Sequence, residues 1–217
     1  MLFIVLPNGE RIPHDAEEAC YLLTDNWDDW FRFSTLYTLV YCDELGEHHD
    51  IGGVKIGQFD MDLEQRRANI PEEFQELGDQ FFSLGQDEGY YEALNAIGVD
   101  IRDDILTSLR DVAIDPELFD QVLAEDVTGV SLLRNVTKSS VRGQFARIAK
   151  GGARLSRYEF SYTAPKWGAR SPEPITLEFD VEPESTPPTN IHVLIGRNAV
   201  GKTFLLNHMT RALVEQK

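Results

Sequence analysis

Ile191-His-Val-Leu-Ile-Gly196-Arg-Asn-Ala-Val-Gly201-Lys202-Thr203-Phe-Leu-Leu206 is the stretch from which the rest of the chain is interpreted. A short apolar run comes first, then the pattern Gly-x-x-x-x-Gly-Lys-Thr, then an apolar segment that reaches Val214. The apolar run predicts a strand buried on both faces, and the last segment predicts a helix. A strand, a glycine-rich loop and a helix, in this order, are the context that a phosphate-binding loop requires.

Each residue type in this pattern has a chemical reason to be there. Gly196 and Gly201 let the loop curl so that successive backbone N–H groups point at phosphate oxygens. Lys202 brings an ammonium for the β- and γ-phosphates, and the Thr203 hydroxyl can ligate Mg²⁺ at the positive N-terminal end of the helix. The expected nucleotide contacts are Gly196, Arg197, Asn198, Ala199, Val200, Gly201, Lys202, Thr203 and Phe204.

Asn198 inside the loop and the pair Leu205-Leu206 after it resemble the ABC-type ATPases of the SMC/RecF/OLD-like group, within the AAA-family P-loop ATPases. Two alternating segments, residues 158–163 and 175–181, resemble the antiparallel strands that lead into the loop in that group. The resemblance covers about residues 154–217. Ala199 stands where many members carry a second glycine, and Phe204 stands where many carry Ser or Thr.

The resemblance implies binding of ATP with Mg²⁺, Lys202 as the catalytic cation, and hydrolysis when two nucleotide domains of a homo-oligomer enclose the nucleotide. It also implies a DNA-linked task such as repair or antiviral defence. The Q-loop, the signature motif, the acidic Walker B strand and the switch histidine should follow Lys217. We therefore expect the N-terminal part of a longer ATPase that is inactive by itself. In isolation, the last 25 or so residues should pair with another copy, pack on residues 154–183, or fray.

The composition fits a soluble globular protein: 217 residues, 42% hydrophobic and 26% charged. No apolar run approaches the roughly 18 residues of a membrane span. The first residues lack the basic region of a signal peptide, so we expect a cytoplasmic protein without membrane contact. The two cysteines, Cys20 and Cys42, are too few for a metal cluster and are interpreted as packed thiols.

The net charge of −17 is unevenly distributed along the chain. Residues 1–130 contain 30 Asp/Glu and 7 Lys/Arg, whereas residues 131–217 contain 7 and 13. The acidic part repels nucleic acid, so DNA contact would come only from segments outside this chain or from the basic residues of the 138–157 region, Lys138, Arg142, Arg147, Lys150, Arg154 and Arg157. These cations are interpreted as solvated surface, an anion or nucleic-acid contact, or a clamp onto the acidic part.

The acidic surface is interpreted as solubilising, as a docking face for a protein partner, or as a DNA mimic. The rival to the ATPase hypothesis is therefore an acidic regulatory or docking module with an idle phosphate loop.

The expected fold is mixed α+β and α/β in two domains. Residues 1–152 form an acidic domain with a β-hairpin and other strands in 1–60 and helices in 72–150; residues 153–217 begin an ABC-type ATPase domain, and Gly151-Gly152 marks the boundary. Strands are expected at 2–6, 11–13, 31–41 and 49–57, with a turn at 43–47. Helices are expected at 16–23, 72–84, 90–97, 101–112, 116–123 and 139–149, with caps at Asp15, Asp100 and Asp115 and stops at Gly85 and Gly98.

Four other motifs have a structural interpretation. Trp27 and Trp30, three apart, share one face of a helical turn and are expected to pack in the core or at its edge; the alternative is that they are exposed and mark a binding surface. Residues 38–44 imitate a Walker B strand but precede the loop and are interpreted as hairpin. His48, His49 and Asp50 are interpreted as a solvated turn, since adjacent strand residues point to opposite faces. Asp60 and Asp62 are interpreted as a strand end or helix cap, because no third metal ligand is evident.

Overall fold

The computed structural model describes residues 1–62, 64–166, 174–183, 185, 187 and 189–214. The chain divides into two compact units, Met1–Arg154 and Leu155–Lys217, so the division lies two residues beyond the expected one. The first unit holds 30 Asp/Glu and 13 Lys/Arg, whereas the second holds 7 of each. The whole net charge of −17 therefore belongs to the first unit.

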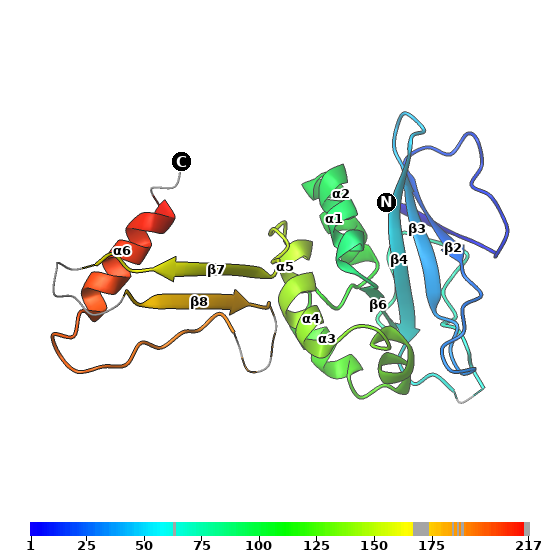
Figure 1. Cartoon of the computed structure of the whole chain (residues 1–217). Helices are drawn as coiled ribbons and strands as arrows, with labels where there is room; N and C mark the ends of the chain where they lie inside the picture. The colour runs from blue at the N-terminus through cyan, green and yellow to red at the C-terminus, as the bar shows by residue number, and fades with distance from the viewer. Residues whose placement is uncertain (63, 167–173, 184, 186, 188, 215–217) are drawn as a thin grey trace. The chain divides into compact units, whose positions relative to one another are not determined.

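A six-stranded sheet forms one layer of the first unit (Figure 1). The strand order is β5-β1-β2-β3-β4-β6; β1 and β2 run parallel, and the other neighbours are antiparallel. The strands are β1 (Leu2–Leu6), β2 (Ala19–Thr24), β3 (Leu36–Cys42), β4 (His48–Gln58), β5 (Glu73–Phe74) and β6 (Phe81–Gly85).

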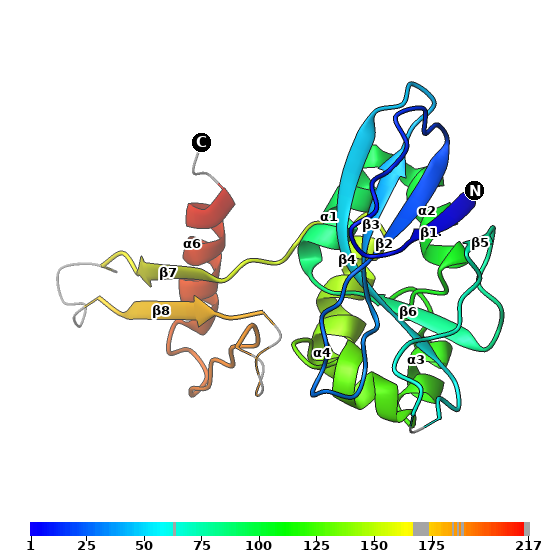
Figure 2. The ribbon, with the colours of Figure 1, turned by 90° about the vertical axis from the view of Figure 1, so that its right-hand side faces the viewer.

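The helical segments of the first unit gather on one side of this sheet (Figures 1 and 2). They are α1 (Glu88–Ile97), α2 (Val99–Ser108), α3 (Pro116–Val122), η1 (Thr128–Leu132), α4 (Lys138–Ser140), η2 (Val141–Phe145) and α5 (Ala146–Ala149), of which η1 and η2 are π-helical. The main hydrophobic core lies between them and the sheet. Helix α1 packs closely because Gly85 has no side chain: a Cβ there would lie 2.3 Å from the Tyr90 ring.

Residues 7–18 supply a smaller second cluster. Ala16 packs there with Ala19, Tyr21 and Cys42 of the sheet, and Ile12 lies against them. The long connection between the parallel strands β1 and β2 thus buries apolar side chains that the helical layer does not contact.

The hairpin around residues 43–47 was predicted and is confirmed. Strands β3 and β4 pair antiparallel, and the Asp43 carboxylate accepts hydrogen bonds from the backbone N–H groups of Leu45 and Glu47, both at 2.9 Å. The predicted strand at 31–41 is shorter than expected, because β3 begins only at Leu36. Asp60 lies just beyond the end of β4, as predicted, where its backbone N–H donates to Glu125.

The helices predicted at 90–97, 101–112 and 116–123 correspond to α1, α2 and α3, and the segment 138–149 is helical throughout. Asp115 caps α3 as predicted, accepting a hydrogen bond from Leu118 N at 2.9 Å. Gly98 ends α1 but also precedes α2 directly, so Asp100 lies inside the first turn of α2 and is not its cap.

The helix predicted at 16–23 is wrong, since this segment contains the central strand β2. Its first four residues are buried, and β1 and β3 hydrogen-bond to its two edges. Non-local pairing overrides the local preference that Asp15 and the two glutamates suggested. The partner expected for β1 at 11–13 is wrong for the same reason, because β1 pairs with β2 and β5.

The helix predicted at 72–84 is also wrong. Phe74, Leu77, Phe81 and Leu84 are all buried, as their helical spacing suggested, but they lie on two strands and the turn between them. All five residues of β6 are buried, which is typical of a strand covered on both faces. Gly85 is therefore the last residue of a strand and stops no helix.

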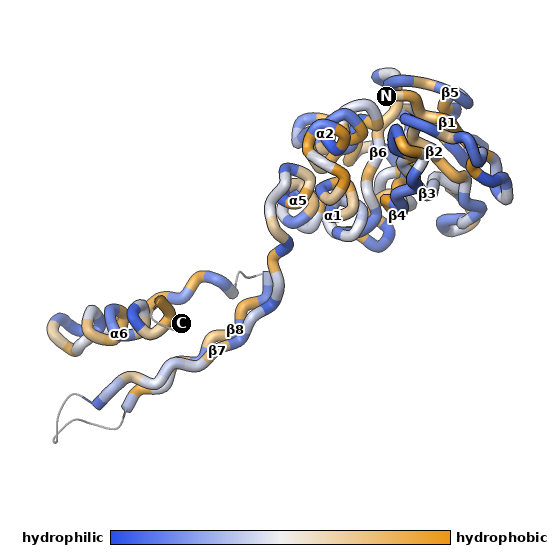
Figure 3. The backbone as a smooth tube through the Cα atoms, turned by 90° about the horizontal axis from the view of Figure 1, so that it is seen from above, coloured by the Kyte–Doolittle hydropathy of each residue, from blue (hydrophilic) through white to orange (hydrophobic). Residues whose placement is uncertain are grey.

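The second unit contains one hairpin and one helix among its described residues. Strands β7 (Tyr158–Thr163) and β8 (Thr176–Val181) pair antiparallel, as predicted, and the Phe160 and Phe179 rings stack at 4.5 Å. Helix α6 (Lys202–Val214) follows the glycine-rich loop, with hydrophobic and hydrophilic residues mixed along it (Figure 3). The strand predicted at 191–195 does not form, because no described strand hydrogen-bonds to it.

Candidate functional site

The glycine-rich loop bends sharply immediately before α6. Ala199 and Gly201 have φ angles of +66° and +95°, in the left-handed region. Ala199 therefore adopts a conformation that glycine adopts more readily, which is the residue many ABC-type ATPases carry at this position. Gly196 lets the two ends of the loop approach, since a Cβ on it would lie 3.2 Å from the Val200 side chain. Helix α6 begins at Lys202, and Leu205 N donates to Gly201 O at 2.9 Å.

The Lys202 ammonium folds back over the loop. Its Nζ donates to the backbone carbonyls of Gly196 and Arg197, at 2.7 and 2.8 Å. These acceptors are neutral and exposed, so the ammonium lies at the helix N-terminus without a carboxylate partner in these contacts. A phosphate oxygen would form a stronger, charge-assisted hydrogen bond to the same ammonium.

The other predicted nucleotide contacts differ in how accessible they are. Asn198 and Val200 are exposed on the loop, and Thr203 is exposed in the first turn of α6, where its hydroxyl is accessible to a cation. Phe204 points its ring along the helix, since the ring lies 3.9 Å from the His208 ring between centroids. Phe204 is therefore expected to contribute its backbone N–H and not its side chain.

The apolar run before the loop is solvent-exposed instead of buried. Ile191, Val193 and Ile195 are 70%, 77% and 88% exposed. The ring of His192, between them, contacts Phe179 of β8 at 4.9 Å. Of the three outcomes expected for this segment, packing on residues 154–183 is limited here to the His192–Phe179 contact, and pairing with another copy stays a prediction.

These residues fit a magnesium–triphosphate in their chemistry. The loop supplies a positive-φ curl, a lysine ammonium, a helix N-terminus and an accessible threonine hydroxyl, which are the donor and ligand types that such a group requires.

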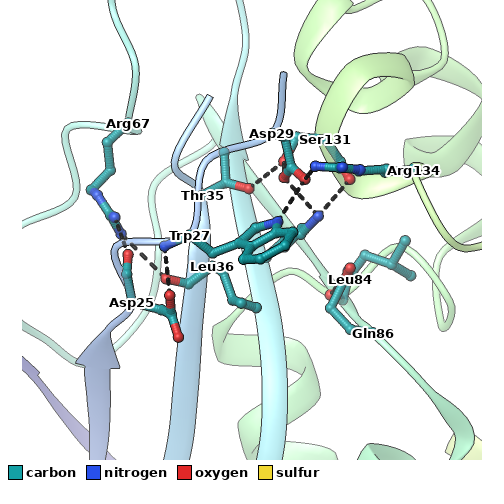
Figure 4. Close-up of polar contacts among 11 residues, drawn as sticks. Asp25, Trp27, Asp29, Thr35, Leu36, Arg67, Leu84, Gln86, Ser131 and Arg134 are labelled. Atoms are coloured by element: carbon teal, nitrogen blue, oxygen red, sulfur yellow. Dashed lines mark hydrogen bonds and ion pairs between the residues drawn. The ribbon is translucent and has the colours of Figure 1, made fainter. Parts of the chain in front are cut away.

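A second polar cluster, which the sequence did not reveal, lies inside the first unit (Figure 4). The Asp29 carboxylate accepts hydrogen bonds from Lys55 Nζ at 2.7 Å, Ser131 Oγ at 2.5 Å, Arg134 Nη1 at 2.8 Å and Trp27 Nε1 at 3.1 Å. Asp29, Lys55 and Ser131 are all buried. Because the aspartate is so fully paired and enclosed, this Asp29 cluster is interpreted as an anchor that joins β4, η1 and residues 27–33.

The surroundings shift the pKa of both members of the buried pair, Asp29 and Lys55. Burial alone raises the pKa of Asp29, but hydrogen bonds from Lys55, Ser131 and Arg134 together lower it below its usual value. Burial lowers the pKa of Lys55, and the contact with Asp29 offsets part of that effect. The only local signal in the sequence is the position of Lys55 between Val54 and Ile56 on a strand.

Trp27 and Trp30 do not pack in the core, and their exposure is what the alternative interpretation, a binding surface, requires. They are 53% and 70% exposed, and Phe31 beside them is 94% exposed. The segment is not helical; an isolated bridge between Asp29 and Phe33 closes it into a tight loop. Both indole rings nevertheless face the same group, because the Arg134 guanidinium lies 5.5 Å from the Trp27 ring and 5.0 Å from the Trp30 ring.

The basic residues of the 138–157 region contact acidic partners at several points. Arg142 pairs with Asp120, and Arg154 lies 4.0 Å from Glu88, both within the first unit. Arg157 pairs with Asp180 at 2.6 Å within the second. The clamp onto the acidic part is therefore confirmed for Arg142 and Arg154, which leaves less positive charge for nucleic acid.

The turn predicted at His48, His49 and Asp50 is wrong, because these residues begin β4 and pair with β3, and only His49 belongs to a group of metal-ligand types among the described residues. Its Nε2 lies 2.9 Å from Asp43 Oδ2, and Asp43, Glu47 and His49 each offer a ligand atom within 4.8 Å of the others. His48 and Asp50 do not belong to this group, in line with the opposite faces of adjacent strand residues.

Comparisons with known proteins give a relative that matches nearly the whole of this chain. Protein ea59 of Escherichia phage lambda is 37% identical over 212 residues, which cover 97% of this chain and 40% of the relative. The chain thus spans about 40% of the length of that protein. No family model matches the chain, and no solved structure matches it. Within the described residues, every helix is too short or too polar to cross a lipid bilayer.

Proposed function

We propose that this chain binds magnesium–ATP at residues 196–204 and forms the nucleotide-binding start of an ABC-type ATPase of the SMC/RecF/OLD-like group. The observation that supports the proposal best is the position of the Lys202 ammonium, held over a positive-φ loop at the N-terminus of α6.

The residues of the loop have different roles in nucleotide binding. Lys202 exchanges its two carbonyl acceptors for phosphate oxygens, and the backbone N–H groups of residues 197–203 hold the remaining oxygens. Thr203 supplies a hydroxyl ligand to Mg²⁺. In phosphoryl transfer the protein mainly positions groups and neutralises charge, so the residue that orients the attacking water is still needed. By the family resemblance it would come from outside residues 1–217, as would the second nucleotide domain that closes the site in a homo-oligomer with a DNA-linked task.

Calorimetry of ATP binding in the presence of Mg²⁺ tests the proposal. The wild-type chain should bind, and Lys202→Ala should lose at least tenfold in affinity, because one charge-assisted contact contributes about 1.5–3 kcal/mol. Lys166→Ala, an exposed lysine of the same unit, is the matched control and should bind like the wild type. Thr203→Ala should lose affinity only when Mg²⁺ is present. Equal ATP affinity of the wild type and Lys202→Ala would refute the role given to the loop.

The idle-loop alternative rests on a different observation, namely that the whole net charge of −17 belongs to the first unit. Such a surface suits docking as well as solubility. Measuring phosphate release by the chain tests the idle-loop alternative. Hydrolysis that disappears in Lys202→Ala excludes an idle loop, whereas ATP binding without hydrolysis is expected from both hypotheses.

A further inference from the structure

Three exposed aromatic residues occupy one short loop of the first unit, which we call the aromatic loop (Trp27, Trp30 and Phe31). A soluble protein rarely places a 94% exposed phenylalanine beside a 70% exposed tryptophan without a binding role. The backbone of the loop adds a second anomaly: Trp30 and Phe31 have φ angles of +57° and +58°. Bulky residues are outliers in the left-handed region, and each costs about 1–2 kcal/mol there.

The strain is maintained by the Asp29 cluster. The Asp29 carboxylate is fixed by four donors, and backbone hydrogen bonds in both directions join Asp29 to Phe33, at 2.7 and 3.3 Å. Phe33 itself is buried. With both ends fixed, the three intervening residues must turn outward, so the loop displays Trp30 and Phe31 to solvent. Strained residues persist where the surrounding structure holds them rigidly in place. Such residues are concentrated at functional sites.

A contact within the first unit shows which kind of chemical group these aromatic rings bind. The Arg134 guanidinium lies over the rings of both Trp27 and Trp30, and it keeps its hydrogen bond to Asp29. The face of an aromatic ring is electron-rich and attracts cations, arginine most often. Trp30 and Phe31 retain most of their surface for a second cation of the same kind.

The charge of the first unit selects among partners that bind aromatic residues. A net −17 repels the phosphates of nucleic acid and of anionic lipids, and it also repels a second copy of the same unit. The same charge steers a basic segment toward the surface. The three arginines around the loop do not reverse this preference, since Arg32, Arg66 and Arg134 pair with Asp126, Asp28 and Asp29.

We propose that the aromatic loop is a docking site for an arginine-rich segment of a partner protein, whose guanidinium groups stack on Trp30 and Phe31. The proposal is independent of nucleotide binding, which involves the other unit. It accounts together for the exposure, the backbone strain and the acidic charge.

The test measures binding of a fluorescent peptide of alternating arginine and glycine to the full chain by anisotropy. The wild type should bind it and should not bind the glutamate counterpart. Trp30→Ala/Phe31→Ala should weaken binding about tenfold, the loss expected for two exposed cation–π contacts. Leu45→Ala removes an equally exposed side chain, 82% accessible, from a turn of the same unit and should leave the affinity unchanged. Phe31→Ala alone, which removes no core contact, should weaken binding about threefold.

Several results would overturn the proposal. One is unchanged peptide affinity in the aromatic variants, and another is a wild-type chain that does not bind the peptide. A third is aromatic-dependent binding of oligothymidylate or of phosphatidylserine vesicles in place of the peptide. A fourth is a dimer, seen by sedimentation velocity, that dissociates when Trp30 and Phe31 are replaced, because the loop would then serve a second copy of the chain.

Discussion

Replacing Lys55 by methionine should destabilise the first unit severely, because it removes one charge of a buried pair and leaves the other. Methionine has nearly the length of lysine, so the buried space that Lys55 occupies stays largely filled and the change is mainly electrostatic. Asp29 loses the donor at 2.7 Å, and the Ser131 carbonyl loses its donor at 2.8 Å.

The expected loss follows from what remains around Asp29. Breaking a buried ion pair costs about 3–5 kcal/mol. Arg134 still contacts the carboxylate at 2.8 Å and is 25% exposed, so part of the charge stays compensated and the lower end of that range, about 3 kcal/mol, applies. With a urea m-value of about 2 kcal/mol per molar, the unfolding midpoint should fall by about 1.5 M.

Urea titrations followed by far-UV circular dichroism measure this loss. Lys150→Met, at an exposed lysine, is the control and should change the free energy of unfolding by less than about 0.5 kcal/mol. In a double-mutant cycle, Asp29→Asn with Lys55→Met should cost less than the sum of the two single changes, by about 2 kcal/mol. A loss below about 1 kcal/mol for Lys55→Met, or strict additivity in the cycle, would contradict the description of the pair as a buried anchor.

The pH dependence of the free energy of unfolding gives an independent check that the Asp29 carboxylate stabilises the folded state in its charged form. The pKa of Asp29 is lowered in the folded state, so its stabilising effect is complete above the unfolded pKa of about 3.9 and is lost as pH falls through the lower folded value. The difference in the free energy of unfolding between wild type and Asp29→Asn should therefore be constant from neutral pH down to about pH 4 and shrink below it. A difference that is already lost at pH 6 would exclude Asp29 as the responsible group.

Three further changes test other parts of the first unit. Phe31→Gly should stabilise the unit by about 0.5–1 kcal/mol, since glycine adopts its φ of +58° without strain, and should weaken peptide binding; a thermal melt that shows destabilisation would mean that the ring packs structurally. Burial raises the pKa of Asp111 to about 6, so the stability it contributes is present below about pH 4 and lost as pH rises through 6. This amounts to about 2–3 kcal/mol, and Asp111→Asn should flatten the stability profile over that window; an unchanged slope would reject the assignment. Gly85→Ala should cost about 1–3 kcal/mol because its Cβ would lie 2.3 Å from the Tyr90 ring, whereas Gly129→Ala, with open space around the new Cβ, should not; equal melting temperatures for the two variants would show that the ring moves freely.

Local chemistry in the sequence predicted those elements whose determinants are local. The turn at 43–47 depends on the Asp43 carboxylate, which bonds to backbone groups two and four residues away. The start of α3 depends on Asp115, which bonds to N–H groups two and three residues away. In such cases the residues that determine the element lie within a few positions of it. A local sequence pattern therefore contains all the information needed to predict it.

Elements decided by distant residues could not be predicted in the same way. The segment that forms β2 has acidic residues before it that favour a helix, yet its partners are β1 and β3, which fix it as a central strand. The Asp29 cluster joins side chains up to 105 positions apart, and no spacing rule indicates such contacts. The exposure of Trp27 and Trp30 was only the second interpretation for a related reason, because it follows from the anchoring of Asp29 and not from the tryptophans themselves.

The same distinction explains why only part of the expected strand, loop and helix is formed in the second unit. Helix α6 closes its hydrogen bonds between residues four apart, and the loop is shaped by contacts of Lys202 with carbonyls five and six positions away. A buried parallel strand has no such internal bonds, since every N–H and C=O group must pair with a neighbouring strand. Residues 191–195 have the apolar composition of that strand but are hydrogen-bonded to no described strand, and three of their side chains are more than two-thirds exposed. The loop and the helix are thus fixed by their own residues, whereas the preceding strand needs hydrogen-bonding partners that the described strands do not supply.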